Sequence, residues 1–198
     1  MSRSLWEAVD SRSRLGNDWC PVILDTSVAL NLLATGAGLA VLESLDVDCF
    51  VCSAVVEETL YIRRDDPTQP RQAVSIEEWL PSGAVKIVNP DSPLEEEFYV
   101  QFTADLDDGE AMSLAICRSR GYALATDDRK ARRVAGQLAL PSVQLRSTSQ
   151  IVHHWAIRAG AAPRDLRRIL SVIELRARFI PPHDDPLREW WLRIRSEA

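Results

Sequence analysis

The stretch Val22-Ile23-Leu24-Asp25 constrains the fold of this chain more than any other. Its apolar run contains two β-branched residues and predicts a buried strand, which ends at a carboxylate. Thr26 and Ser27 follow, and either is expected to cap a helix over residues 28–33. Ligands of open parallel sheets bind beyond the carboxyl ends of the strands, so Asp25 either caps that helix or holds a ligand.

Strands and helices are predicted to alternate along the rest of the chain. Strands are expected at residues 49–52, 85–88, 122–126 and 143–145, with helices at 39–45, 54–62, 74–80, 94–102, 107–120 and 129–138. This alternation implies βαβ units, and therefore an α/β fold with a parallel sheet. Further helices make residues 147–198 a helical extension, and residues 1–20 are an N-terminal extension. No repeat or linker divides the chain, so we expect one domain over residues 1–198.

Composition limits the class of protein. Hydrophobic residues make up 46% of the 198 residues, enough for the core of one α/β domain. No apolar run approaches the length of a membrane span, and the N-terminus lacks a secretory apolar region. We therefore expect a cytoplasmic protein with no membrane partner. The four cysteines lie in or beside apolar segments, which favours reduced thiols, and no second Cys/His pair completes a zinc set with Cys49 and Cys52.

Charge is distributed unevenly along the chain. The net charge of −6 alone argues against a nucleic-acid partner. However, residues 1–109 carry 7 basic and 20 acidic side chains, whereas residues 110–180 carry 13 and 5. This asymmetry indicates either a polarised surface with a site or solvated helix faces that happen to differ.

Acidic side chains recur close to the predicted carboxyl ends of the strands. Besides Asp25, they are Glu57, Glu58, Asp107, Glu110, Asp127 and Asp128. Singly, each acid could cap a helix or offset a helix dipole. Together they converge on one edge of the sheet, where carboxylates repel one another unless a cation neutralises them. Carboxylate oxygens suit Mg²⁺ or Mn²⁺, so the pattern predicts hydrolysis of a phosphodiester by a metal-activated water.

Four motifs in this order resemble the PIN domain, the fold of metal-dependent ribonucleases that include VapC-type toxins. They are Asp25-Thr26-Ser27 after an apolar strand, an acid early in the second crossover helix, Gly109-Glu110-Ala111 opening the buried helix, and Thr126-Asp127-Asp128 after the next strand. The resemblance covers about residues 20–145. It implies a three-layer α/β/α fold with a central parallel sheet, followed by extra C-terminal helices.

Two rival folds fail at identifiable residues. A haloacid-dehalogenase-type phosphatase would need a second aspartate two positions after Asp25, where Ser27 stands. A receiver domain would need an acidic pair at the end of the first strand and a lysine after a late strand, but Asp25 is single and Thr126 is followed by an acid. The remaining alternative is a non-catalytic PIN-like scaffold that binds RNA or protein, against which the near-complete set of acids argues.

Carried over residue by residue, the resemblance implies four metal ligands. The pattern places an acid three residues after Val55, which selects Glu58 over Glu57. At the fourth strand the T-x-D form selects Asp128, with Asp127 as the alternative catalytic acid. The implied ligands of Mg²⁺ or Mn²⁺ are Asp25, Glu58, Glu110 and Asp128.

Further residues are assigned to catalysis and RNA binding. The resemblance implies that Ser27 and Thr26 offer hydroxyls to metal-bound water or phosphate. An acidic site cannot itself attract phosphates, so the basic helix and the arginines of residues 158–178 are candidate backbone contacts, unless they form a solvated face. The expected substrate-binding residues are Thr26, Thr126, Arg129, Lys130, Arg132 and Arg133.

The resemblance also implies partners. The expected protein is an endoribonuclease acting on RNA, covered by a small antitoxin and paired through a two-fold homodimer interface. One independent hint comes from the adjacent Trp190 and Trp191, which cannot both face one core. One indole is therefore expected on a surface that is covered by the N-terminal extension, a second copy or an antitoxin.

Overall fold

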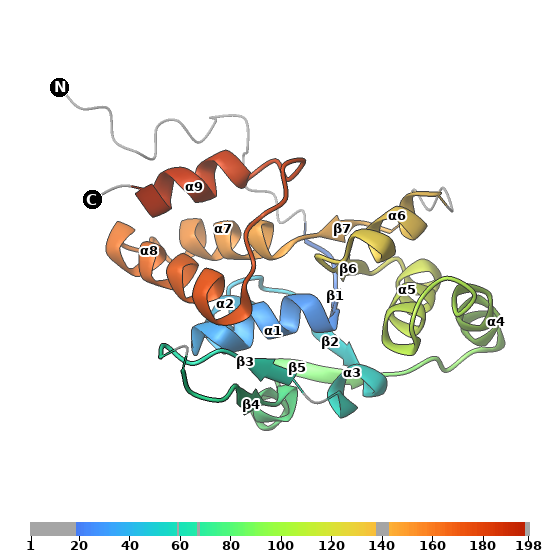
Figure 1. Cartoon of the computed structure of the whole chain (residues 1–198). Helices are drawn as coiled ribbons and strands as arrows, with labels where there is room; N and C mark the ends of the chain where they lie inside the picture. Colours follow the sequence, from blue (N-terminus) through green and yellow to red (C-terminus); the bar gives the residue numbers. More distant parts are fainter. Residues whose placement is uncertain (1–18, 59, 67, 138–142, 197–198) are drawn as a thin grey trace.

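A five-stranded parallel sheet forms the centre of the molecule, in the order β5-β2-β1-β6-β7 (Figure 1). The structure is a computed structural model that describes residues 19–58, 60–66, 68–137 and 143–196. Its strands are β1 (Val22–Leu24), β2 (Cys49–Cys52), β5 (Val85–Val88), β6 (Ala123–Ala125) and β7 (Leu145–Arg146). Helices cover both faces of the sheet, which confirms the predicted three-layer α/β/α fold.

The helices divide between the two faces. They are α1 (Thr26–Thr35), α2 (Gly38–Glu43), α3 (Ser53–Glu57), α4 (Pro93–Phe102), α5 (Asp108–Arg120), α6 (Arg129–Gln137), α7 (Thr148–Arg158), α8 (Pro163–Val172) and α9 (Arg188–Ser196). On one face, α5 packs against β1, β2 and β6 and is covered by α4. On the other face, α1 packs against α2, α7 and α8, and α9 lies over α8. The predicted C-terminal helices are therefore present.

β1 lies in the middle of the sheet because all of its side chains are apolar. Every residue of β1 is fully buried, as expected for a strand covered on both faces. Leu24 pairs with Ala125 of β6, and Ile23 pairs with Phe50 of β2. This register places Asp25 beside the residues that follow β6, at the carboxyl edge of the sheet.

The helix predicted over residues 54–62 is wrong in its second half. α3 ends at Glu57, and Glu58 has an extended backbone with φ −70° and ψ 133°. The strand β3 (Leu60–Ile62) then pairs antiparallel with β4 (Gln72–Val74). The aromatic and β-branched residues of this segment favour a strand once a partner strand is present.

Two other local predictions are corrected. The segment predicted as a helix over 74–80 is the end of β4 followed by a 3₁₀ helix, η1 (Ile76–Ser82), whose first turn is capped by the Ser75 hydroxyl. Neither Thr26 nor Ser27 caps α1, because Asp25 occupies the N-cap position. Ser27 lies inside α1, where its hydroxyl donates to Asp25 at 2.8 Å and accepts from the backbone N–H of Asp127 at 3.0 Å.

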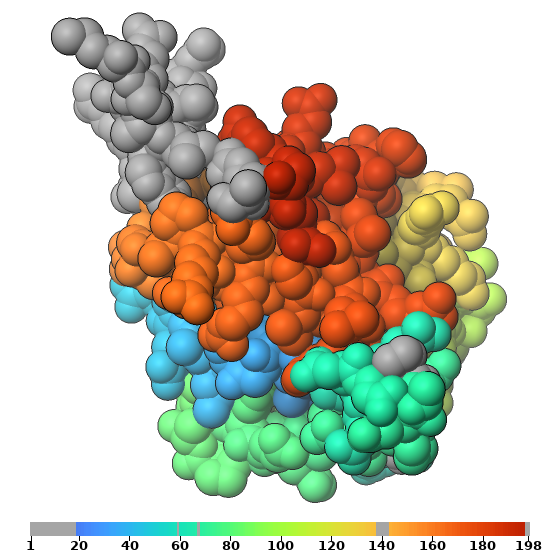
Figure 2. Space-filling view, turned by 60° about the vertical axis from the view of Figure 1, so that its left-hand side comes forward, coloured from blue at the N-terminus to red at the C-terminus, as the bar shows by residue number. Residues whose placement is uncertain are grey.

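The C-terminal segment folds back over the domain. A single π-helical turn, η2 (Ile173–Ala177), ends at Arg178, whose φ of 62° is left-handed. Arg176 of η2 forms a bidentate ion pair with Asp65, with both N–O distances at 2.8 Å, which fastens this segment to the loop between β3 and β4 (Figure 2). Residues 178–187 then run back toward the carboxyl edge of the sheet and lead into α9.

The two tryptophans of α9 are covered by this chain's own elements. Trp191 is fully buried, and its Nε1 donates to Glu174 of η2 at 2.7 Å. Trp190 is partly buried, with its ring edge-on to His153 of α7 and 4.7 Å between the centroids. The covering surface of Trp190 thus includes α7, which was not among the three candidates. The N-terminal extension, apart from Trp19 and Cys20, lies outside the described residues.

No helix in the described part of the chain is long and apolar enough to cross a bilayer.

A buried ion pair joins α4 to α5. Glu95 is 1% exposed and accepts two hydrogen bonds from Arg120, at 2.7 Å from Nε and 2.9 Å from Nη2. The guanidinium lowers the pKa of Glu95 from its ordinary value of 4.5 to about 2. Because this shift is downward, the stabilisation is complete above about pH 4.5 and disappears as the pH falls toward 2.

Glu95→Gln should therefore destabilise the protein by about 3 kcal/mol at pH 7, because it leaves the Arg120 charge without its buried partner. Exposed Glu97 on the same helix provides the matched control, and Glu97→Gln should change stability by less than about 0.5 kcal/mol. Urea unfolding at pH 7 and at pH 3 measures both effects. An equal loss for the two variants would contradict the assigned role of Glu95.

Candidate active site

Asp25 is the innermost acid of the carboxyl edge and is only 4% exposed. Its Oδ2 accepts hydrogen bonds from the hydroxyls of Ser27 and Thr126, both at 2.8 Å. Burial raises the pKa of Asp25, while these hydroxyls act in the opposite direction. Asp25 is therefore held in one orientation by groups from two strand ends, which is how a reactive or ligating carboxylate is pre-organised.

Glu58 enters the same edge from the end of α3. Burial raises its pKa most, followed by the negative charges of Asp107 and Asp25, while a hydrogen bond from the Thr26 hydroxyl lowers it. A Cβ at Gly109 would lie 3.3 Å from Glu58 Oε1, which is tighter than ordinary contact. The missing side chain at Gly109 thus lets Glu58 lie against the first turn of α5.

Glu110, in that first turn, also has a raised pKa. Burial contributes most to raising it to about 7, and the charges of Asp107, Asp25 and Asp128 add to the shift. Those three acids come from three different segments of the chain. Glu110 therefore shows that carboxylates far apart in sequence share one electrostatic field, as the sequence predicted.

Asp107 belongs to this cluster, although the sequence analysis gave it no ligand or catalytic role. It does cap α5, since its Oδ1 accepts from the backbone N–H of Glu110 at 2.9 Å. It also raises the pKa of both Glu58 and Glu110 by charge repulsion. The D-x-x-E spacing was the available signal, but a capping box accounts for it completely in a sequence.

The chemistry of this acid cluster fits a divalent cation. Within the described residues, no group of three or more His, Cys, Asp or Glu side chains is already arranged to hold a metal ion. Repulsion keeps like charges apart when no cation lies between them, so binding requires side-chain rotation. Carboxylate oxygens are the ligands of hard ions, and Mg²⁺ or Mn²⁺ would relieve the repulsion that adds to burial in raising the pKa values of Glu58 and Glu110.

Asp127 and Asp128 point to different neighbours. Asp127 accepts hydrogen bonds from the Thr148 backbone N–H (3.0 Å), the Thr148 hydroxyl (2.5 Å) and Asn31 Nδ2 (2.9 Å). Burial raises the pKa of Asp127 to about 6. Asp128 accepts from the backbone N–H groups opening α6 and also raises the pKa of Glu110. Asp127 therefore ties β6 to α1 and α7, while Asp128 adjoins the acid cluster.

Sequence comparison identifies the family to which this edge belongs. The family model of the PIN domain matches residues 21–163, which contain all of the acids described above. The chain belongs to the PIN-domain family. PIN domains are generally nucleases and generally use divalent metals, and PIN nucleases act on RNA and often pair with antitoxins. No curated protein matches the chain significantly.

In this PIN domain the basic helix α6 begins directly after Asp128. Arg129, Lys130 and Arg133 are exposed. Arg132 is partly buried, and its Nη1 donates to the carbonyl oxygens of Thr126 at 2.9 Å and of Arg146 at 3.4 Å. Arg132 therefore fixes α6 against the ends of two strands, while the three exposed cations face solvent beside the acid cluster.

Thr126, which was predicted to bind substrate, has a fully buried hydroxyl that instead donates to Asp25 and orients it.

Asp25→Asn should lower the pKa of Glu110 below its present value of about 7, because it removes one of the charges that repel the ionised form. Carbon-13 NMR titration of the Glu110 carboxyl group in metal-free protein measures the change. Asp165→Asn, at an exposed position on α8, is the control and should leave that pKa unchanged. Titration of Glu110 at the same pH in Asp25→Asn and in the parent would mean that the two acids do not share a site.

Proposed function

We propose that the protein is a Mg²⁺- or Mn²⁺-dependent endoribonuclease that hydrolyses RNA phosphodiester bonds in the cytoplasm. The observation that carries this proposal is the placement of acids from separate segments at one edge, where the negative charges of Asp25 and Asp128 add to burial in raising the pKa of Glu110. Phosphate groups would be repelled from such an edge as well. A divalent cation removes both conflicts, and PIN-domain membership supports the same chemistry.

The protein's own groups divide the work in this proposal. The side chains that would hold the ion are Asp25, Glu58, Glu110 and Asp128. A divalent ion held there would neutralise phosphate charge and would supply an activated water molecule as the nucleophile. The hydroxyls of Ser27 and Thr126 keep Asp25 oriented, and the Thr26 hydroxyl does the same for Glu58. Asp127 accepts hydrogen bonds from Thr148 and Asn31, which fix the backbone and so position the next residue, Asp128.

RNA contacts are proposed for the basic helix α6. Arg129, Lys130 and Arg133 are exposed immediately beyond Asp128, so they can meet backbone phosphates on either side of the reacting one. Arg132 supports this helix from behind through its bonds to backbone carbonyls. These cations would attract the phosphates of the RNA strand and so offset their repulsion by the neighbouring acidic side chains.

A finer part of the proposal concerns biological context. Family membership supports a role as the toxin of a toxin–antitoxin pair, with a small antitoxin that covers the site and a homodimer as the working unit. Residues 1–198 would act as one PIN-like domain carrying the two extensions. The competing function is a non-catalytic scaffold that binds RNA or protein.

Asp25→Asn should reduce RNA cleavage by about 100-fold or more, equivalent to roughly 2.7 kcal/mol of transition-state stabilisation, because it removes a ligand charge but keeps the side-chain shape. The assay follows end-labelled RNA with Mg²⁺, with Mn²⁺ and with EDTA. The parent chain should cleave only with metal, and circular dichroism should show the same fold for both proteins. Asp165→Asn, at an exposed position on α8, should cleave at the parent's rate.

Cleavage that persists in EDTA would refute the metal-dependent mechanism, as would an Asp25→Asn protein as active as the parent. RNA binding without cleavage under any metal condition would establish the scaffold instead.

A further inference from the structure

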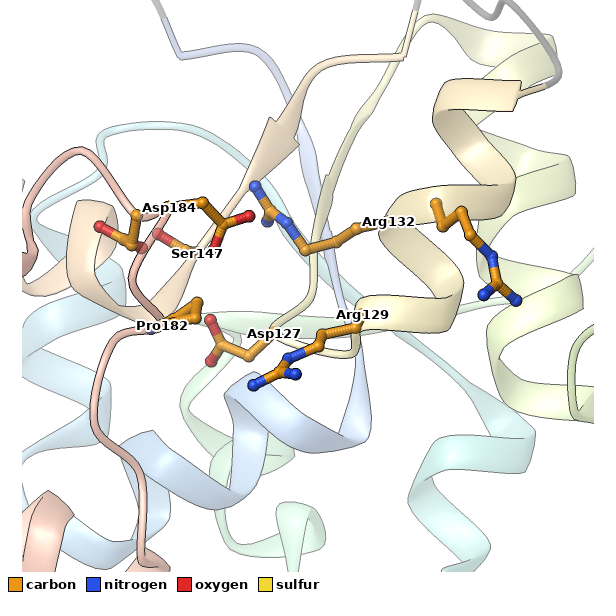
Figure 3. Close-up of a pocket in the computed structure, with 8 residues that line it drawn as sticks. Asp127, Arg129, Arg132, Ser147, Pro182 and Asp184 are labelled. Atoms are coloured by element: carbon orange, nitrogen blue, oxygen red, sulfur yellow. The ribbon is translucent and has the colours of Figure 1, made fainter.

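A cavity of about 340 Å³ opens beside the acid cluster, between α6 and the segment that leads from η2 to α9. Its lining residues are Asp127, Arg129, Arg132, Arg133, Ser147, Pro182, Asp184 and Asp185. Figure 3 shows Arg129 extending from α6 toward Asp127, and Arg132 extending above it toward the side of the cavity that carries Ser147 and Asp184. Its volume lies in the range of small-ligand sites. Asp127 in the wall directly precedes Asp128, and its backbone N–H donates to the Ser27 hydroxyl at 3.0 Å, which in turn donates to Asp25. The cavity therefore adjoins the proposed reaction site.

The two walls of the cavity carry opposite charges that are held apart. On the α6 side, Arg132 is fastened to the carbonyl oxygens of Thr126 and Arg146. On the other side, Asp185 accepts from the Ser149 hydroxyl at 2.7 Å and from the Leu187 backbone N–H at 2.8 Å. Among the residues that the structure describes, no ion pair joins the arginines to the aspartates across the cavity. The walls therefore keep a gap between donors and acceptors.

Arg129 and Asp184 supply unused hydrogen-bonding groups on these walls. Both are exposed, and neither side chain has a hydrogen bond or ion pair with another described residue. A guanidinium offers only donors, and a carboxylate offers only acceptors. A ligand that uses both walls would therefore present acceptors to Arg129 and donors to Asp184.

A phosphate group alone does not meet this requirement, because Asp184 and Asp185 would repel it. A nucleobase does, since single-stranded RNA is read on the Watson–Crick and Hoogsteen edges of unstacked bases. Guanine is the only one of the four RNA bases with two neighbouring acceptors on one edge, O6 and N7, and two neighbouring donors on another, N1–H and N2–H₂. Arginine pairs with O6 and N7 in the commonest specific contact to guanine.

We propose that this cavity binds the guanine base of an RNA nucleotide adjacent to the cleaved phosphodiester bond. Arg129 and the remaining N–H groups of Arg132 face the O6 and N7 edge, and the Asp184 carboxylate accepts from N1–H and N2–H₂. This inference rests on the proposed ribonuclease function and names the sequence preference of the same site. The segment after η2, which supplies Asp184, would thus select the RNA substrate.

The test measures binding of GMP, AMP, CMP and UMP to the full metal-free chain by isothermal titration calorimetry. GMP should bind at least about 10-fold more tightly than the other three, since a bidentate pair discriminates by that much or more. Asp184→Asn keeps the size of the side chain but offers one acceptor and an unwanted donor, so it should abolish the preference for GMP. Asp165→Asn changes the net charge equally at an exposed position outside the cavity and should preserve the preference.

Equal binding of the four nucleotides would overturn the inference, because it would indicate contact with phosphate alone. No measurable binding, or an unchanged preference in Asp184→Asn, would overturn it as well. RNA cleavage is measured separately on the same preparations. If the chain cleaves RNA but shows no preference for GMP, the ribonuclease proposal stands and the guanine site is refuted. If the chain prefers GMP but cleaves no RNA, the guanine-binding cavity stands and the ribonuclease proposal is refuted.

Discussion

The parallel pairing of β1 with β6 is the constraint on which the site depends. It sets Leu24 opposite Ala125, so that the next residue of each strand, Asp25 and Thr126, meets at the carboxyl edge of the sheet. The hydroxyl of Thr126 then donates to Asp25 across 101 positions of sequence. A slip of β6 by one residue against β1 would turn the side chains of β6 to the opposite faces and separate Thr126 from Asp25. The catalytic proposal therefore begins with backbone geometry.

Electrostatic repulsion is the cost of this arrangement. Folding brings Asp25, Glu58, Glu110 and Asp107 into one field. Burial raises the pKa values of Glu58 and Glu110 most, and the negative charges of Asp107 and Asp25 raise them further. The fold holds them there because β-strand pairing and the burial of α5 contribute far more stability than the repulsion removes. A bound cation would remove this repulsion, so the arrangement of the acids favours cation binding.

Sequence patterns predicted the sheet and its acids because apolar strands, caps and breaks leave local signals. Asp25, Glu110 and the limits of α5 follow from such signals. The hairpin β3–β4 was not predicted, because Leu60 to Ile62 becomes a strand only through pairing with a distant segment. The same limit applied to Asp127 and Asp128, whose different partners on α7 and α6 depend on tertiary packing. The cavity beside α6 was also hidden, since Asp184 reaches it only after the chain has folded back.

The most direct test of the central claim is calorimetric titration of Mn²⁺ into the metal-free chain. If the converging carboxylates form one cation site, Mn²⁺ binds saturably, and Asp25→Asn and Glu110→Gln each weaken it by about 10-fold or more, since each removes a ligand charge. Exposed Glu97 gives the matched control, and Glu97→Gln should bind as the parent does. Equal Mn²⁺ affinity in the parent, Asp25→Asn and Glu110→Gln would contradict the account.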